Sequence, residues 1–307
     1  MVKCNKCLSE AVTYIRYNGT HLCHKHFNEY VVGRVKKEIR SQLTISGPVK
    51  IAVGISGGKD SAVALELIFK ILGERRDVKI EAITVDEGIA GYRPRTILMA
   101  KAQTSRLNVP HHIVTFREVV GADLDEIVGM GEKRMACSYC GVFRRRCLNI
   151  KAREIGASFL ATGHNLDDTA QSILMNFMRG DVERLARMGP HIKVQPGLIP
   201  RLEPLRSVPE GETMLFAMIN DLEHADDVCP YAGSALRNEF REIIDSMESR
   251  HPGTRHSIVA SYDSVRTCLT EKYPQPSLRM CSCGEPTCNV KCMACEMLDK
   301  LNKGRGL

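Results

Sequence analysis

The sequence lacks any long apolar run. None of its hydrophobic stretches approaches the roughly 18 uninterrupted apolar residues of a membrane span, and the start, Met1-Val2-Lys3-Cys4, has no secretory apolar core. We therefore expect a cytoplasmic protein without a membrane partner. In such a reducing compartment, 13 cysteines at short spacings indicate metal or redox chemistry rather than a disulfide framework.

The chain also lacks two common nucleotide-binding patterns. A Walker A alignment puts Val53 at the first glycine and Asp60 at the Mg-binding hydroxyl, and Gly-x-Gly-x-x-Gly does not fit either. Instead, Ser56-Gly57-Gly58-Lys59-Asp60-Ser61 joins a Val/Ile-rich run at 49–55 to a helical pattern at 62–72. This order predicts a strand, a phosphate-binding turn and a helix capped by Asp60 or Ser61. The loop resembles that of the ATP pyrophosphatases, although an ordinary glycine-rich turn is the alternative.

The length and charge fit a globular, nucleic-acid-binding protein. At 307 residues and a formal charge of +7, one large core with small appendages and a polyanionic partner are expected. Alternating strand and helix patterns from 49 to 230 predict a doubly wound parallel sheet. The expected strands are 79–86, 111–116 and 158–162, and the expected helices are 94–107, 140–155 and 167–179. The polar motifs all follow strands, where ligands of such sheets bind.

The first 27 residues hold two close pairs of metal ligands, Cys4 with Cys7 and Cys23 with His26. This spacing predicts a tetrahedral structural zinc site, with His24 as the alternative to His26. A module of residues 1–27 is too short for its own core and needs the metal to fold. A basic amphipathic helix is expected at 27–44. It supplies most of the linker, residues 28–48, that joins the N-terminal module to the central domain.

A second metal module is predicted at 276–307. Its firm ligands are Cys283, Cys292 and Cys295, and the fourth is Cys281 or Cys288. Before it, residues 231–275 carry helical patterns at 233–249 and 255–272. We expect this extension either to contact nucleic acid or to form a plain helical cap. Its arginines are Arg237, Arg241, Arg250, Arg255 and Arg266.

Cys137 and Cys140 form a Cys-x-x-Cys at a helix start beside arginines. Zinc would need two further ligands, whereas an iron–sulfur cluster with an open position needs only one. Cys147, Cys229 and Cys268 are the candidates. Cys147 lies about 10 Å along the helix, so Cys229, in a loop before Pro230, is better placed.

Taken together, the motifs resemble the zinc-flanked tRNA 2-thiouridine synthetases of the PP-loop (ATP pyrophosphatase) superfamily over nearly the whole chain. The resemblance rests on the two terminal metal modules and on four internal motifs. These motifs are the 56–61 loop, Cys137-x2-Cys140-Gly141, Gly163-His164-Asn165-x-Asp167-Asp168 and Cys229-Pro230. Within that group, residues 85–93, 139–145 and 179–185 are similar to the archaeal and eukaryotic cytoplasmic enzyme that acts on the wobble uridine.

The resemblance implies a fold and a set of cofactors. The fold is an ATP pyrophosphatase-like α/β domain at 49–230 flanked by zinc modules, and the cofactors are ATP, Mg²⁺, two Zn²⁺ and a [4Fe-4S] cluster on Cys137, Cys140 and Cys229. Catalysis falls on Arg144, Asp168 and Asp60, with Arg144 in electrostatic positioning rather than as a base. The C-terminal zinc set is Cys281, Cys283, Cys292 and Cys295. The implied nucleotide-binding residues are Ser56, Gly57, Gly58, Lys59, Asp60, Ser61, Asp86, Gly163 and His164.

The implied activity is that of a tRNA sulfurtransferase that adenylates uridine 34 and replaces its C2 oxygen by sulfur delivered on the cluster. Sulfide or a thiocarboxylated ubiquitin-like carrier is the expected donor, and a homodimer the expected assembly. Tyr92 or Arg93 is expected to hold or stack on an anticodon base, or else to build a loop over the adenine. The alternatives are the same chemistry on uridine 54 of the T-loop, an ATP-dependent ligase, and a non-catalytic zinc protein that binds nucleic acid.

Overall fold

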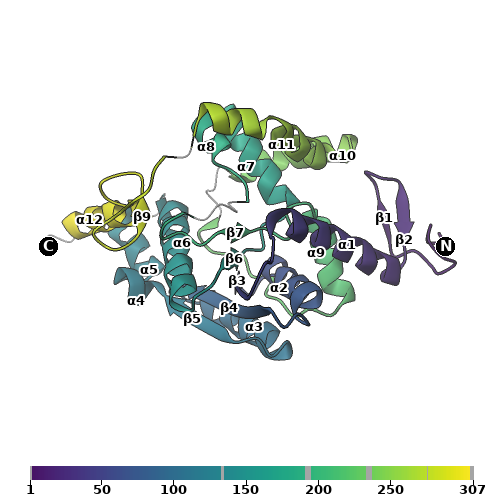
Figure 1. Ribbon diagram of the computed structural model, residues 1–307, viewed down its shortest axis with the longest axis horizontal. Coiled ribbons are helices and arrows are strands. Elements are labelled where there is room, and N and C mark those ends of the chain that lie inside the picture. Colours follow the sequence, from purple (N-terminus) through teal and green to yellow (C-terminus); the bar gives the residue numbers. More distant parts are fainter. Residues whose placement is uncertain (1, 133–134, 191–194, 233–236, 275, 305–307) are drawn as a thin grey trace.

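The computed structural model describes residues 2–132, 135–190, 195–232, 237–274 and 276–304. A central sheet lies between layers of helices, and the two termini lie at opposite ends of the long axis (Figure 1). None of the helices in these ranges has the length and apolar character to cross a membrane.

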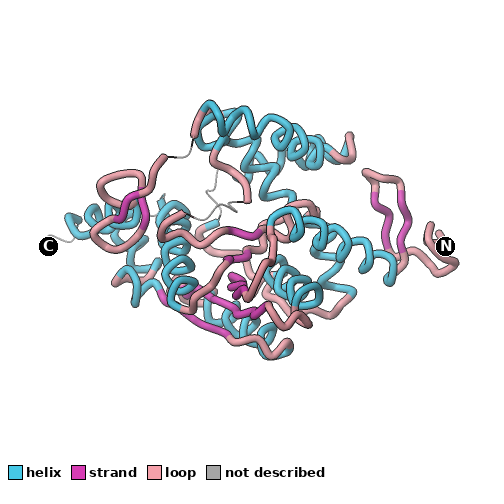
Figure 2. The backbone as a smooth tube through the Cα atoms, in the orientation of Figure 1, coloured by secondary structure: helices cyan, strands magenta, loops and turns pink. Residues whose placement is uncertain are grey.

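The central sheet has five parallel strands in the order β5-β4-β3-β6-β7. Figure 2 shows them stacked in the middle of the molecule. Because the chain runs outward from β3 to β5 and then returns to place β6 beside β3, the strand order reverses between β3 and β6. The carboxyl ends of these two strands are therefore where a ligand is expected. The strands are β3 (Val49–Gly54), β4 (Val78–Asp86), β5 (His111–Thr115), β6 (Phe159–Ala161) and β7 (Arg201–Leu202).

Both faces of the sheet are buried, which explains the unbroken apolar run in β3. Ile51 and Val53 point into a core shared with α1 (His24–Gln42), α2 (Lys59–Leu72) and α9 (Glu210–Ile219). Ala52 points to the opposite face, where α6 (Ala136–Glu154) packs. The predicted doubly wound sheet is confirmed. The other helices around it are α3 (Arg93–Arg106), the short α4 (Phe116–Val120) and α5 (Leu124–Ile127), and the π-helix η1 (Val128–Glu132).

Four helices form a separate layer next to β6 and β7. This layer comprises α7 (Leu166–Met178), α8 (Val182–Ala186), α10 (Arg237–Arg250) and α11 (Thr254–Lys272). They share a small core that includes Leu166, Leu185, Ile244 and Tyr262. The expected helix at 255–272 is present, and so is that at 233–249 from Arg237 onward; residues 233–236 lie outside the described residues.

Each terminal module has a short hairpin and a helix. The N-terminal hairpin is β1 (Thr13–Ile15) with β2 (Thr20–Leu22), and α1 follows it. The C-terminal hairpin is β8 (Arg279–Met280) with β9 (Pro286–Thr287), followed by α12 (Met293–Gly304), which packs against α6. The apolar side chains of each module join the central cores, so the modules are docked on the sheet domain.

The predicted cap of α2 was wrong, and α1 and α6 start earlier than expected, at His24 and Ala136. α2 begins at Lys59 and its N-cap is Gly58, not Asp60 or Ser61. Ser61 lies in the first turn, where its hydroxyl bonds back to the Gly58 carbonyl at 2.9 Å. The helix expected around 140–155 starts at Ala136, which confirms the prediction that Cys137 and Cys140 lie at the start of a helix.

Candidate active site and metal centres

The loop after β3, residues 56–61, has the shape of a phosphate-binding loop, and we call it the phosphate cradle. Gly57 has φ of +89°, and a Cβ there would lie 2.0 Å from the Thr96 carbonyl oxygen, so only glycine fits. The Ser56 and Ser61 hydroxyls lie 3.1 Å apart, and Ser61 Oγ also accepts from Ser56 N at 3.1 Å. The first turn of α2 follows the two glycines directly. Its backbone N–H groups have no intrahelical acceptors, so they can donate hydrogen bonds to phosphate oxygens.

Lys59 and Asp60 are held by helices that are distant in sequence. Lys59 Nζ lies 2.9 Å from Asp60 Oδ2 and 2.7 Å from Glu210 Oε1. Although burial opposes it, these carboxylates raise the pKa of Lys59, which stays a cation. Asp60 Oδ1 accepts from Thr213 Oγ1 at 2.7 Å and from Asn165 Nδ2 at 3.2 Å. Asp60 is thus an anchor for α9 and α7, and only its Oδ2 can turn to a metal ion if Lys59 moves.

The loop after β6 lies directly against the phosphate cradle. A Cβ on Gly163 would be 2.8 Å from Ser61 N and 3.0 Å from the Asp60 carbonyl oxygen. His164 Nδ1 lies 2.8 Å from Thr162 Oγ1. Asp168 Oδ2 accepts from the backbone N of Asn165 at 3.2 Å, in a capping box at the start of α7. The structure thus brings Gly163, His164 and Asp168 together with the 56–61 loop.

The loop after β4 contributes a buried carboxylate between two arginines. Glu87, with a side chain 3% exposed, lies 2.6 Å from Arg93 Nε and 2.8 Å from Arg144 Nε. Arg93 also donates to the Ser56 carbonyl at 3.1 Å. Of the two residues expected to hold an anticodon base, Arg93 is unsuited because its side chain is 4% exposed and supports the cradle, so the prediction stays with the half-buried Tyr92. Asp86 turns its carboxylate to the Gly88 N–H at 2.9 Å and shapes the same loop.

Arg144 connects this carboxylate to the thiols. Its Nη2 lies 3.2 Å from Cys140 Sγ, one turn earlier on α6. Cys137 Sγ contacts the Tyr231 carbonyl at 3.4 Å, two residues after Cys229. Burial raises the pKa of the Cys140 thiol to about 11, Arg144 opposes this, and Cys229 is near enough for its charge to add to the increase.

The other two cysteines proposed for this group lie elsewhere. Cys147 is fully buried in the core under α6, and Cys268 is exposed on α11. Within the described ranges, only the two terminal sets have three or more ligand atoms within 4.8 Å of one another. The sulfurs of Cys137, Cys140 and Cys229 therefore do not all lie within 4.8 Å of one another, as the ligands of a single ion would.

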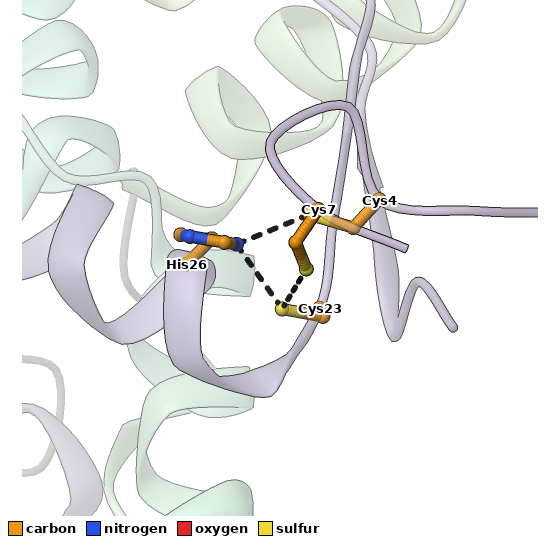
Figure 3. A group of neighbouring side chains, drawn as sticks. All are labelled: Cys4, Cys7, Cys23 and His26. Atoms are coloured by element: carbon orange, nitrogen blue, oxygen red, sulfur yellow. Dashed lines mark hydrogen bonds between the residues drawn. The ribbon is translucent and has the colours of Figure 1, made fainter. Parts of the chain in front are cut away.

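The N-terminal ligand atoms converge as expected for one ion. Cys4 Sγ and Cys23 Sγ each lie 3.3 Å from His26 Nδ1, and Cys7 Sγ lies 3.7 Å from Cys23 Sγ (Figure 3). His24 is not in the group, because its Nε2 bonds to the Ile219 carbonyl at 2.8 Å.

The C-terminal set contains Cys281 and not Cys288. Cys281 Sγ lies 3.8 Å from Cys295 Sγ, and Cys283 Sγ lies 3.6 Å from Cys292 Sγ. All four belong to one group of ligand atoms within 4.8 Å, whereas Cys288 is exposed outside it.

The sequence reasoning missed several supports of the site. Glu210 and Thr213 come from α9, which was not predicted, although Pro209 before two acidic residues is a helix-start signal. Arg255 was expected either on a nucleic-acid surface or in a plain helical cap. Its guanidinium instead pairs with Asp167 at 2.5 Å and with Asp245 and Glu248, so its charge is neutralised.

A glycine cradle at the reversal point of a parallel sheet defines a nucleotide-binding domain of the PP-loop class. A family profile described as a PP-loop domain matches residues 30–247. A second, described as the N-terminal LIM domain of the 2-thiouridine synthetase TtuA, matches residues 3–28.

Relatives match the chain over nearly its full length. The tRNA 2-thiolation protein NcsA of Haloferax volcanii is 36% identical, over 98% of this chain and 99% of the relative. The tRNA-5-methyluridine(54) 2-sulfurtransferase of Pyrococcus horikoshii is 32% identical, over 96% and 93%. The solved U34-tRNA thiolase NcsA from Methanococcus maripaludis with its [4Fe-4S] cluster has a TM-score of 0.85 at 34% identity, over 98% and 97% of the chains. The chain belongs to the PP-loop family of tRNA 2-thiolation sulfurtransferases.

Proposed function

We propose that this protein uses ATP to adenylate uridine 34 of tRNA and then replaces the C2 oxygen of the base by sulfur. The observation that carries the proposal is the chain of contacts from the phosphate cradle to the thiols, through Arg93, Glu87 and Arg144. An ATP-dependent ligase has no need of these cysteines, and a non-catalytic zinc protein has no need of the cradle.

The residues suit the two chemical steps. The first-turn N–H groups of α2 and the Lys59 cation hold the phosphates, while the uracil C2 oxygen attacks the α-phosphorus and pyrophosphate leaves. The adenylated oxygen is then a good leaving group, so that sulfur bonds to C2 as AMP departs. Arg144 is always protonated and acts through its charge. Asp168 and His164 are the residues proposed to face the reacting base and the nucleotide, and Asp60 would help to hold Mg²⁺ once Lys59 turns from it to the phosphates.

The three thiols fit an iron–sulfur cluster with an open position. Cys137, Cys140 and Cys229 are a soft donor set of three thiols, and they do not all lie within 4.8 Å of one another as the ligands of one ion do. When bound, such a cluster supplies a site for a deprotonated sulfur nucleophile.

The choice of uridine 34 rests on the U34-tRNA thiolase match, which covers 98% of this chain. Mass spectrometry of tRNA from a deletion strain tests it. We expect 2-thiouridine to disappear from position 34 of the tRNAs for Lys, Glu and Gln. Loss of the T-loop 2-thiouridine with an intact wobble 2-thiouridine would instead show that uridine 54 is the substrate.

Further parts of the proposal concern the surroundings of the site. Each terminal set offers four Cys or His ligands with no open position, which suits structural Zn²⁺. The sulfur donor, the homodimer and the cytoplasmic location stay predictions.

A further inference from the structure

A cavity of 340 Å³ runs along α7 and opens beside His164 and Asp168. We call it the α7 groove. α7 contributes one wall through Asp168, Ser172 and Asn176. The opposite walls come from α8 and its continuation, the segment after β7, α10 and α11. Their polar residues are Arg184, Arg187, Glu203, Arg206, Arg237 and Tyr262.

The rim of the α7 groove is rich in arginine. The side chains of Arg184, Arg187 and Arg237 are 61%, 40% and 41% exposed. Each pairs with one carboxylate, but a guanidinium has five N–H donors, so donors stay available for a second anion. Glu203 offsets only part of this charge, because burial raises its pKa to about 7 and leaves it partly protonated near neutral pH.

More positive charge gathers where the α7 groove meets the active site. Within the described residues, Arg145 and Arg201 make no ion pair. Burial lowers the pKa of both, and like charges add to this effect, from Arg144 and Arg184 on Arg145 and from Arg145 on Arg201. Burial lowers the pKa of His164. The charge of Asp168 opposes this shift, and the charges of Arg237 and Arg201 add to it. The cations in this region therefore exceed their acidic partners, as an anion-binding site requires.

The α7 groove also offers apolar surface beside these charges. Met175 and Met188 line it. Outside the lining, at the end of α7, Phe177 and Met178 are exposed. Apolar and aromatic faces next to arginines are the combination that holds unstacked bases and their phosphates.

We infer that the α7 groove binds the single-stranded RNA next to the target uridine, with Arg184 and Arg187 on its phosphates. This inference rests on the proposed function, since it places the RNA that carries the reacting base. The α7 groove is lined along α7 from Asp168 to Asn176, about 12 Å at the rise of an α-helix, and this length suits an extended strand better than a small ion.

The test is a double variant, Arg184→Gln with Arg187→Gln, compared with Arg75→Gln with Arg76→Gln. The control pair removes the same charge at the other edge of the sheet, where α2 leads into β4. Binding of unmodified tRNA is measured at several salt concentrations, together with ATP binding, metal content and Tm.

The rim variant is expected to bind tRNA about ten-fold more weakly, with a salt slope reduced by about 1.4 for two lost single-strand phosphate contacts. Its ATP affinity and metal content should match the control, and Tm should change little because the lost ion pairs are exposed.

Equal tRNA affinities of the two double variants would overturn the inference. So would a loss of ATP binding without a loss of tRNA binding, which would assign the α7 groove to the nucleotide. Failure of the proposed function is distinguishable, because the unaltered protein would then leave tRNA without 2-thiouridine whatever the rim variants bind.

Discussion

At the scale of single residues, the candidate site depends on one buried carboxylate. Glu87 meets two guanidinium groups at 2.6 and 2.8 Å, and one of them, on Arg93, is as buried as Glu87 itself. A buried cation that loses its partner is costly, because protein surroundings solvate it poorly. Glu87 is therefore a positioning residue that fixes Arg144 beside Cys140 and Arg93 under the phosphate cradle.

Replacing Glu87→Gln should lower the free energy of unfolding by about 3–5 kcal/mol, the usual effect of breaking a buried ion pair. The matched control is Asp77→Asn, which breaks a pair with Arg75 whose side chains are 46% and 37% exposed. That change should cost no more than about 1 kcal/mol. Denaturant unfolding of both variants at equal metal content provides the measurement. Equal effects would mean that Glu87 does not neutralise Arg93.

Gly163 is the second residue on which the site geometry depends. Gly163→Ala would place a methyl group 2.8 Å from Ser61 N, and neither backbone can yield without separating β6 from α2. We expect ATP affinity to fall at least about ten-fold, since a displacement of about 1 Å has a cost of this order in an active site. Gly33→Ala, in α1 with open space around it, is the control and should bind ATP normally. Unchanged ATP binding in Gly163→Ala would argue against the close approach.

At the scale of elements, prediction succeeded where a pattern was long. β3, β4, α2 and α7 each carry several apolar residues at strand or helix spacing, and all were expected. β7 has only two residues, too few for any periodicity, and was missed. The start of α2 was misplaced because the Ser56 and Ser61 hydroxyls close the loop on each other instead of capping the helix.

The N-terminal module is attached to the helical layer by a polar contact. On α1, Arg34 donates to His256 Nε2 on α11 at 2.7 Å and to Tyr30 Oη at 2.8 Å, and the His256 ring packs on Tyr17. Because a guanidinium only donates, the His256 imidazole must be neutral in this contact. Burial, followed by the charge of Arg34, lowers the pKa of His256 to about 4.

This contact predicts acid sensitivity. An unfolded histidine has a pKa of about 6.5, whereas that of folded His256 is about 4. Between these two pH values the unfolded chain binds a proton at His256 and the folded chain does not. Stability should therefore fall as the pH falls through this window. His256→Gln keeps an acceptor for Arg34 without titrating, so its Tm should fall less over the same range. Among the neighbouring charges, Glu248 opposes the shift and Arg255 supports it. Parallel Tm curves for the two proteins would contradict the assignment.

At the scale of the whole molecule, the motifs predicted which loops meet, but not which side-chain contacts hold these loops together. The loops after β3, β4 and β6 had to meet, because parallel strands end at one edge of a sheet. The ion pair from Lys59 to Glu210 joins residues 151 positions apart. No local pattern records such a contact, so it becomes visible only in the folded chain. The same applies to the fourth ligand of the C-terminal set. The spacing of the sequence allowed Cys281 or Cys288, and only the folded chain shows that it is Cys281.

The arrangement separates the proposed iron site from the two terminal metal sites, and metal analysis can show this independence. Cys229→Ala in anaerobically prepared protein should abolish the iron and the brown absorbance and leave about two zinc ions per chain. Cys281→Ser should do the reverse, with about one zinc lost and the iron kept. Cys268→Ala and Cys288→Ser are the controls, since one thiol lies on α11 and the other outside the C-terminal set. A cluster retained in Cys229→Ala would refute the three-cysteine assignment, and zinc lost from Cys288→Ser would refute the C-terminal ligand set. Because soft thiolates bind both metals, iron and zinc must be measured in the same sample.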